Sequence, residues 1–146
     1  MSGSGKDENK RAPMFWTDED AAPGMTSGPP YIESVSHSFP PAVGQVGEPD
    51  SIYSYIRDAV CLRGKYPQIG RGSITVIPTG AGNRVGAVLR EWQGSEIIVA
   101  YNISPEPVTF FLPGTLQDHI SATGETPEQQ DGMLTLPGYT IAILVL

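Results

Sequence analysis

The residues best suited to nucleophilic or metal chemistry in this sequence are two histidines and one cysteine, and they are widely spaced. His37, His119 and Cys61 belong to no ligand motif with the usual short Cys/His spacings. A catalytic triad needs a histidine held between a nucleophile and an acid, and neither histidine has such a motif around it. The sequence therefore predicts no catalytic residue of this kind, no metal site and no cofactor.

Carboxylate pairs can break glycosidic bonds, but only when the fold holds them at a separation of about 5 to 9 Å. Asp18, Glu19 and Asp20 are adjacent in a stretch without helical or strand periodicity, so nothing fixes their separation. We interpret them as a charged surface loop.

The glycine-rich stretches at 70–72 and 80–82 precede or join predicted strands and do not open a helix, so they predict turns rather than a phosphate site.

One group of planar side chains near the N-terminus does suit a ligand. Arg11, Phe15, Trp16 and Tyr31 lie in the same segment, and sugar rings are commonly held by aromatic stacking together with charge-assisted hydrogen bonds. Alternatively, Phe15 and Trp16 anchor the segment to a hydrophobic core. Spacing alone favours the anchor.

Residues 1 to about 48 form a long segment with recurrent proline and glycine and no periodicity. Loops of this length are uncommon inside compact domains, which indicates a segment that belongs to a larger scaffold. A helix is then predicted over residues 51–65, because Asp50 and Ser51 provide a start signal and Pro67 a stop.

The predicted helix has a wide apolar stripe, because apolar residues recur at intervals of three and four. Only irregular chain precedes it, so either the following domain or a part outside this sequence must cover the stripe. Cys61 falls on the apolar side and is expected to be buried. The stripe consists of Ile52, Tyr55, Ile56, Ala59, Val60 and Leu62.

From Gly72 onward the pattern changes to short β-rich runs separated by turn residues. This rhythm predicts a mainly β fold, an antiparallel β-sandwich that follows the amphipathic helix. The first three runs form a meander, and the last, almost wholly apolar, is typical of a central strand. About seven strands are expected, at 73–77, 85–92, 96–101, 108–112, 119–122, 133–136 and 139–146.

Length, charge and composition further narrow the class of protein. The 146 residues are too few for a complete eight-stranded α/β barrel, which needs about 250. The net charge of −7 without a basic cluster argues against a nucleic-acid partner. The single cysteine excludes an internal disulfide bond. Neither a signal peptide nor an apolar run long enough for a membrane span is present, so a cytoplasmic location away from the membrane is expected.

Three stretches resemble the C-terminal part of glycoside hydrolase family 13, the family of α-amylases and α-glucosidases. Residues 6–16 (KDENKRAPMFW) are similar to the Asp-Glu-Asn-x-Arg-Thr-Pro-Met-Gln-Trp pattern that follows the last barrel strand in its α-glucosidases, with Ala12 for Thr and Phe15 for Gln. Residues 23–26 and 50–67 resemble the turn and the final barrel helix that come next, and residues 72–146 resemble the all-β domain, with markers at 99–104 and 136–141.

This resemblance implies that residues 1–69 are the end of a TIM barrel and residues 70–146 a C-terminal all-β domain. It implies a parent enzyme that retains configuration while cleaving α-glucosidic bonds in an α-glucan or oligosaccharide. The family's catalytic carboxylates lie upstream of this stretch, so the chain alone is expected to be inactive. Arg11 matches the family's arginine beside the active site and is the candidate substrate contact. A salt bridge to Asp7 or Glu8 would explain it equally well.

Two other classes of function remain open. One is an autonomous carbohydrate-binding or protein-interaction module formed by the sandwich, with self-association through the helix stripe. The other is that the chain complements a separately encoded half of the barrel in trans, with the helix stripe as the contact between them.

Overall fold

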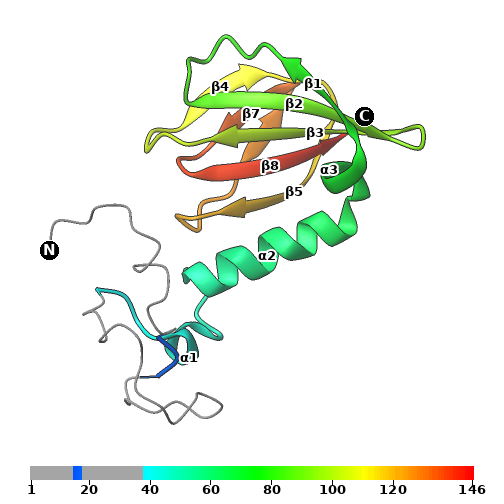
Figure 1. The fold of residues 1–146 in the computed structure, drawn as a ribbon. Coiled ribbons are helices and arrows are strands. Elements are labelled where there is room, and N and C mark those ends of the chain that lie inside the picture. Colours follow the sequence, from blue (N-terminus) through cyan, green and yellow to red (C-terminus); the bar gives the residue numbers. More distant parts are fainter. Residues whose placement is uncertain (1–14, 18–37) are drawn as a thin grey trace, which may run out of the picture.

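Residues 15–17 and 38–146 are described by a computed structural model of the chain (Figure 1). Within these ranges three helices come first and eight strands follow, so the fold is mainly β, as the sequence predicts. The helices are α1 (Ala42–Gln45), α2 (Ile52–Lys65) and α3 (Pro67–Arg71). The strands are β1 (Ser73–Ile77), β2 (Val85–Trp92), β3 (Ser95–Asn102), β4 (Val108–Phe111), β5 (Thr115–Ser121), β6 (Glu128–Gln130), β7 (Met133–Leu136) and β8 (Thr140–Val145).

The strands form two antiparallel sheets that pack into a sandwich. The larger sheet has the order β1-β2-β3-β8-β5 and the smaller one β4-β7-β6. β1, β2 and β3 form the predicted meander. The apolar run at the end of the chain becomes β8, which pairs with β3 and β5 on its two sides and is therefore central, as predicted.

The hydrophobic core lies between the inner faces of the two sheets. Alternation along β3 and β8 sends Ile98, Ala100, Ala142 and Leu144 inward, where each is fully buried. Side chains from the smaller sheet and its flanks complete the core, and burying each large one contributes about 1.5–3 kcal/mol. These are Phe110, Leu112, Leu134 and Leu136.

Turn chemistry fixes the register of the central hairpin. Gln93 and Gly94, between β2 and β3, both have positive φ, at 52° and 76°. Two successive residues of this kind form the tight turn whose twist matches that of the flanking strands. The turn aligns Trp92 with Ser95 and hence all eight pairs of this hairpin.

Helix α2 confirms the predicted helix, including its start. The Ser51 hydroxyl accepts a hydrogen bond from the Ser54 amide at 3.1 Å, which caps the first turn. The helix ends at Lys65, and the Tyr66 amide closes the last turn on the Leu62 carbonyl. Pro67 does not leave the chain in a loop. It is the first residue of α3, where its fixed φ and missing amide proton suit a helix start.

The sequence also predicted fewer elements than the structure contains. One turn of helix, α1, lies within the segment expected to be irregular, and β5 starts at Thr115, before the expected 119. The strand β6 was missed, because Glu128, Gln129 and Gln130 have no apolar alternation. Within the described residues, no helix is long and apolar enough to cross a lipid bilayer.

Candidate functional site

Helix α2 packs on the sandwich through one side only. Near its C-terminal end, Leu62 and Tyr66 contact Ile97 and Ile143, which face outward from the larger sheet. Ile69 of α3 joins the same apolar cluster. Figure 1 shows α2 running beside β5, with α3 folded against the end of the sheet. This contact fixes the direction of α2 relative to the sandwich.

A second apolar side of α2 is uncovered. Ile52, Ile56 and Val60 follow one another at four-residue intervals and therefore share one face. They are 61%, 56% and 64% exposed, and Tyr53 beside them is 44% exposed. Of the six residues in the predicted stripe, Leu62 is covered by the sandwich, whereas these three stay in solvent within the described part of the chain. We call Ile52, Tyr53, Ile56 and Val60 the α2 stripe.

The expected burial of Cys61 is wrong. Cys61 is exposed. The helical repeat places it next to Leu62 in sequence but about 100° further round the helix, away from the sheet. The pattern marked a wide apolar sector without showing which part of that sector the sandwich would cover.

An ion pair and a hydroxyl hold the end of α2 to β5. Lys65 Nζ donates to Asp118 Oδ2 at 2.6 Å, and the Tyr66 hydroxyl donates to the same oxygen. Burial raises the pKa of the Asp118 carboxyl, but the hydrogen bonds from Lys65 and Tyr66 outweigh it and hold that pKa below its usual range. The same hydrogen bond to Asp118 raises the pKa of Lys65. We call these three residues the junction.

Helix α3 is fastened to β2 by a guanidinium group. Arg90 Nε donates to the Gln68 carbonyl at 3.0 Å, and its Nη2 donates to the Ile69 carbonyl at 2.8 Å. These carbonyls point toward the C-terminal end of a short helix, which favours positive charge, and the Gln68 carbonyl also accepts from the Gly72 amide at 2.9 Å. Gln68 Nε2 also donates to Ser95 Oγ at 2.8 Å. The α2–α3 unit is thus attached at several points to the larger sheet.

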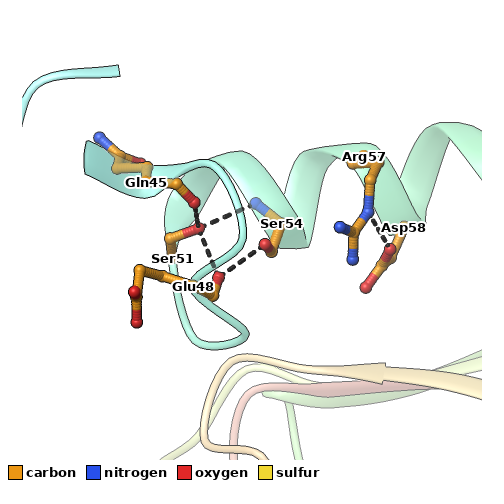
Figure 2. A network of polar contacts seen from close by, with 6 residues as sticks. All are labelled: Gln45, Glu48, Ser51, Ser54, Arg57 and Asp58. Atoms are coloured by element: carbon orange, nitrogen blue, oxygen red, sulfur yellow. Dashed lines mark hydrogen bonds and ion pairs between the residues drawn. The ribbon is translucent and has the colours of Figure 1, made fainter. Parts of the chain in front are cut away.

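Polar contacts join α1 to the start of α2 (Figure 2). Ser51 Oγ lies 2.8 Å from the Gln45 carbonyl oxygen and 2.9 Å from that of Glu48, so its proton is shared between them. Ser54, which is buried, donates its hydroxyl to the Glu48 carbonyl at 2.6 Å. Gln45 Oε1 accepts from the Tyr53 amide at 3.1 Å. The turn between the helices is therefore held from both sides.

Phe15 and Trp16, two of the planar residues singled out near the N-terminus, are hydrogen-bonded to α1. The Ala42 and Val43 amides donate to the Phe15 and Trp16 carbonyls at 2.9 and 3.0 Å, which satisfies the first donors of α1. Phe15 also meets Phe39 edge-on, with ring centroids 6.4 Å apart. Phe39 is itself 46% exposed and Trp16 is 47% exposed. Neither hydrophobic cluster of the sandwich includes Phe15 or Trp16, so the anchor interpretation stays a prediction.

The other residues singled out for chemistry are not brought together by the described part of the structure. Arg11, Tyr31, His37 and the acidic run at 18–20 lie outside the described residues. His119 is exposed on β5. In the described ranges, no three His, Cys, Asp or Glu side chains gather where they could hold a metal ion.

Comparison with known proteins gives a consistent result. No protein-family model matches the chain. Trehalose synthase of Thermus thermophilus is 31% identical over 116 residues, which are 70% of this chain and 11% of that protein. The solved structure of Amy13B from Eubacterium rectale is 26% identical, with a TM-score of 0.85, and the match covers 98% of this chain and 29% of that one.

The trehalulose synthase MutB of Pseudomonas mesoacidophila MX-45 is 27% identical, with a TM-score of 0.73 over 94% of this chain and 25% of that one. The chain corresponds to the C-terminal portion of a glycoside hydrolase family 13 protein. It spans between about a tenth and three tenths of the length of these family 13 relatives. Its sandwich is the C-terminal β domain of the family 13 fold.

Sequence reasoning missed the groups that attach the helices to the sandwich. Asp118 and Arg90 act across 53 and 21 or more residues of sequence, and no local pattern marks such partners. The signal for Ser51 was present, since serine before an apolar-periodic run is a typical helix cap. Gln45 had no such signal.

Proposed function

We propose that this chain supports the catalytic barrel of a family 13 enzyme, and that the α2 stripe is the surface on which the rest of the barrel packs. In this proposal residues 1–69 complete the barrel and residues 70–146 form the supporting β domain. The α2 stripe carries the proposal. A helix already attached to the sandwich through Leu62 and Tyr66 still exposes Ile52, Ile56 and Val60 in one line.

The physical reason is the arrangement of two apolar sides on one helix. An ordinary surface helix has one apolar side toward the core and a polar side toward water. Helix α2 has one side on the sheet and a second in solvent, so it is built to lie between two bodies. Complete burial of each stripe residue would contribute about 1.5–3 kcal/mol to that packing.

The chemistry of the parent enzyme follows from its relatives. The proteins that the chain resembles are named as trehalose synthase and trehalulose synthase, and the latter is solved with sucrose as its substrate. We therefore infer an α-glucosidic oligosaccharide as the substrate class. The carboxylates that break the bond would come from the rest of the barrel, and Arg11 would contact the sugar. The isolated chain is then expected to turn over no aryl α-glucoside.

A chimeric enzyme tests this proposal. The chain would replace the portion of Amy13B that it matches, and the chimera is expected to fold and to hydrolyse an aryl α-glucoside. Ile56→Lys should then reduce the activity and melting temperature of the chimera, because it places a charge in the barrel contact. The same change should leave the melting temperature of the isolated chain nearly unaltered, since Ile56 is 56% exposed there.

Arg57→Gln, one position away and on the exposed side, is the matched control. It should leave both proteins unaltered. If the Ile56→Lys chimera is as stable and active as the unmodified one, the α2 stripe is not the barrel contact and the proposal fails.

A second function, a carbohydrate-binding module, is favoured by one observation. Tyr101 lies directly against Gly86 and is 37% exposed, beside a groove of about 450 Å³ that Val76 and Thr79 also line. An exposed aromatic ring of this kind is a platform on which a sugar can stack. Titration with maltooligosaccharides tests it, with Tyr101→Ala as the comparison. Absence of a saturable signal from the unmodified chain would remove this function.

A further inference from the structure

The first strand of the larger sheet is an open edge. β1 pairs only with β2, so its other side presents unpaired backbone donors and acceptors within the described part of the chain. Ile74 and Val76 point away from the sandwich core and are 65% and 72% exposed. The five residues of β1 include neither a charge nor a proline. Figure 1 shows β1 at the edge of the sheet opposite β5 and α2.

The opposite edge of the same sheet, at β5, is protected against pairing with another strand. The register of β5 shifts between Leu116 and Asp118, and the carboxylate of Asp118 is occupied by Lys65 and Tyr66 of the adjoining helix unit. A bulge, a charge and a covering helix are the devices by which natural sheets prevent edge pairing. The two edges of the smaller sheet are short, at four residues in β4 and three in β6. β1 has no bulge, no charge and no covering helix in the described part of the chain. Only its modest length limits edge pairing.

The sequence of β1 is also complementary to itself. If two copies meet in antiparallel register around Thr75, Ile74 of one lies opposite Val76 of the other, and the reverse pair forms by symmetry. Both pairs lie on the outer faces of the sheets, because Ile74 and Val76 are cross-strand partners of Arg90 and Val88. Four exposed β-branched side chains would then cover one another.

We propose that β1 is a dimerisation edge, at which two copies of this chain join their larger sheets into one continuous ten-stranded sheet. The symmetric register closes the contact, so the expected species is a dimer and not a fibre. Five residues on each side make a small interface, and small interfaces are weak and transient. The dimer should therefore appear at high micromolar chain concentration. Raising the ionic strength should strengthen it, because each copy carries a net charge of −7.

Sedimentation equilibrium of the full chain over a wide concentration range tests the proposal. A monomer–dimer equilibrium is expected, and Val76→Lys should raise its dissociation constant at least about tenfold, because edge lysines prevent strand pairing. Ile56→Lys, on the α2 stripe, is the matched comparison and should leave the dissociation constant unchanged. The dimer contact does not depend on the proposed barrel contact, and these two variants test the two surfaces separately.

Hydrogen exchange supplies the second measurement. Backbone amides of 73–77 should become more protected as the chain concentration rises, and Val76→Lys should abolish this dependence while the circular dichroism spectrum stays the same. A chain that remains monomeric at all concentrations would overturn the proposal. So would a dimer that Ile56→Lys disrupts and Val76→Lys does not, because the α2 stripe would then be the contact between copies.

Discussion

Lys65 and Asp118 lie 53 residues apart in the sequence, yet Lys65 Nζ and Asp118 Oδ2 are 2.6 Å apart in the fold. The pair joins the last residue of α2 to the edge strand β5. Because Tyr66 donates its hydroxyl to the same carboxylate, two successive residues of the helix end are fixed to one acceptor. The direction in which α2 presents its stripe is therefore set partly by this carboxylate.

The first prediction concerns the pH range over which the junction is intact. The pKa of the Asp118 carboxyl is below its ordinary value of 3.8, so its contribution to stability is present above that value and is lost as the pH falls through the lowered pKa. The pKa of Lys65 is above 10.5, so its contribution is present below that value and is lost as the pH rises through the raised pKa. The junction should therefore hold over the whole range between the ordinary aspartate pKa of 3.8 and the ordinary lysine pKa of 10.5.

Asp118→Asn should lower the melting temperature at pH 7 by about 2–4 °C and flatten its decline in acid. Differential scanning calorimetry between pH 2 and 8 measures both effects. Asp58→Asn is the control, because Asp58 pairs with its sequence neighbour Arg57 on an exposed surface, where ion pairs add little. Equal acid sensitivity of Asp118→Asn and the unmodified chain would contradict the assigned role of the junction.

The second prediction concerns Asn102, whose side chain is buried at the end of β3. Its amide nitrogen lies 2.8, 3.2 and 3.1 Å from the carbonyl oxygens of Glu106, Leu136 and Pro137. Its Oδ1 accepts from both the amide and the hydroxyl of Ser104. Asn102→Ala would leave several buried groups without a partner, and we expect a loss of about 2–4 kcal/mol in the free energy of unfolding.

Urea denaturation measures this loss. Ser104→Ala removes a single hydroxyl at the border of the same network and should cost no more than about 1 kcal/mol. A similar small cost for Asn102→Ala would show that the carbonyls find water or other donors.

The third prediction uses two glycines with opposite surroundings. A Cβ added at Gly138 would collide with the backbone carbonyls of Pro105 and Ser104, which cannot move without disturbing the loop before β4. A Cβ added at Gly64 in α2 would meet nothing within 4 Å. Gly138→Ala should therefore destabilise the fold by about 2–4 kcal/mol. Gly64→Ala should stabilise it by about 0.5–1 kcal/mol, because glycine is entropically costly inside a helix. Thermal unfolding of both variants in parallel measures the difference, and the same sign of effect at both positions would contradict this interpretation.

The elements that sequence reasoning predicted well are those whose pattern is set by their own residues. The apolar run of β8 can be satisfied only between two strands, and it lies between β3 and β5. Ser51 with the periodic residues after it defines α2 to within one residue. Such features depend on local periodicity and need no knowledge of distant partners.

The elements that it missed depend on tertiary context. β6 consists of Glu128, Gln129 and Gln130, and it pairs because β7 offers an edge, not because its own pattern is strand-like. Pro67 is compatible both with the end of one helix and with the start of another, and the attachment of α3 to the larger sheet, in part through Arg90, favours the second. The side of α2 that meets the sandwich likewise depends on distant partners, Asp118 together with Ile97 and Ile143, which local sequence does not reveal.

The last prediction separates the two roles of Ser51. As an acceptor its hydroxyl caps α2 through the Ser54 amide, and as a donor it bonds the carbonyls of Gln45 and Glu48. Ser51→Ala removes both roles and should cost about 1 kcal/mol, with faster exchange of the Ser54 amide. Ser51→Asp keeps an acceptor at the cap but cannot donate, and it places a negative charge beside two carbonyl oxygens.

Ser51→Asp should therefore preserve α2 and loosen α1. The reporter is the Tyr53 amide, which donates to Gln45 Oε1 and depends on the position of α1. Its hydrogen exchange should accelerate in both variants, whereas that of the Ser54 amide should accelerate only in Ser51→Ala. If the Ser54 amide also loses protection in Ser51→Asp, the cap and the attachment of α1 are one cooperative unit, and the separation of the two roles is wrong. The distinction bears on the parent enzyme, because α1 carries the backbone contacts to Phe15 and Trp16, in the segment that would border the sugar.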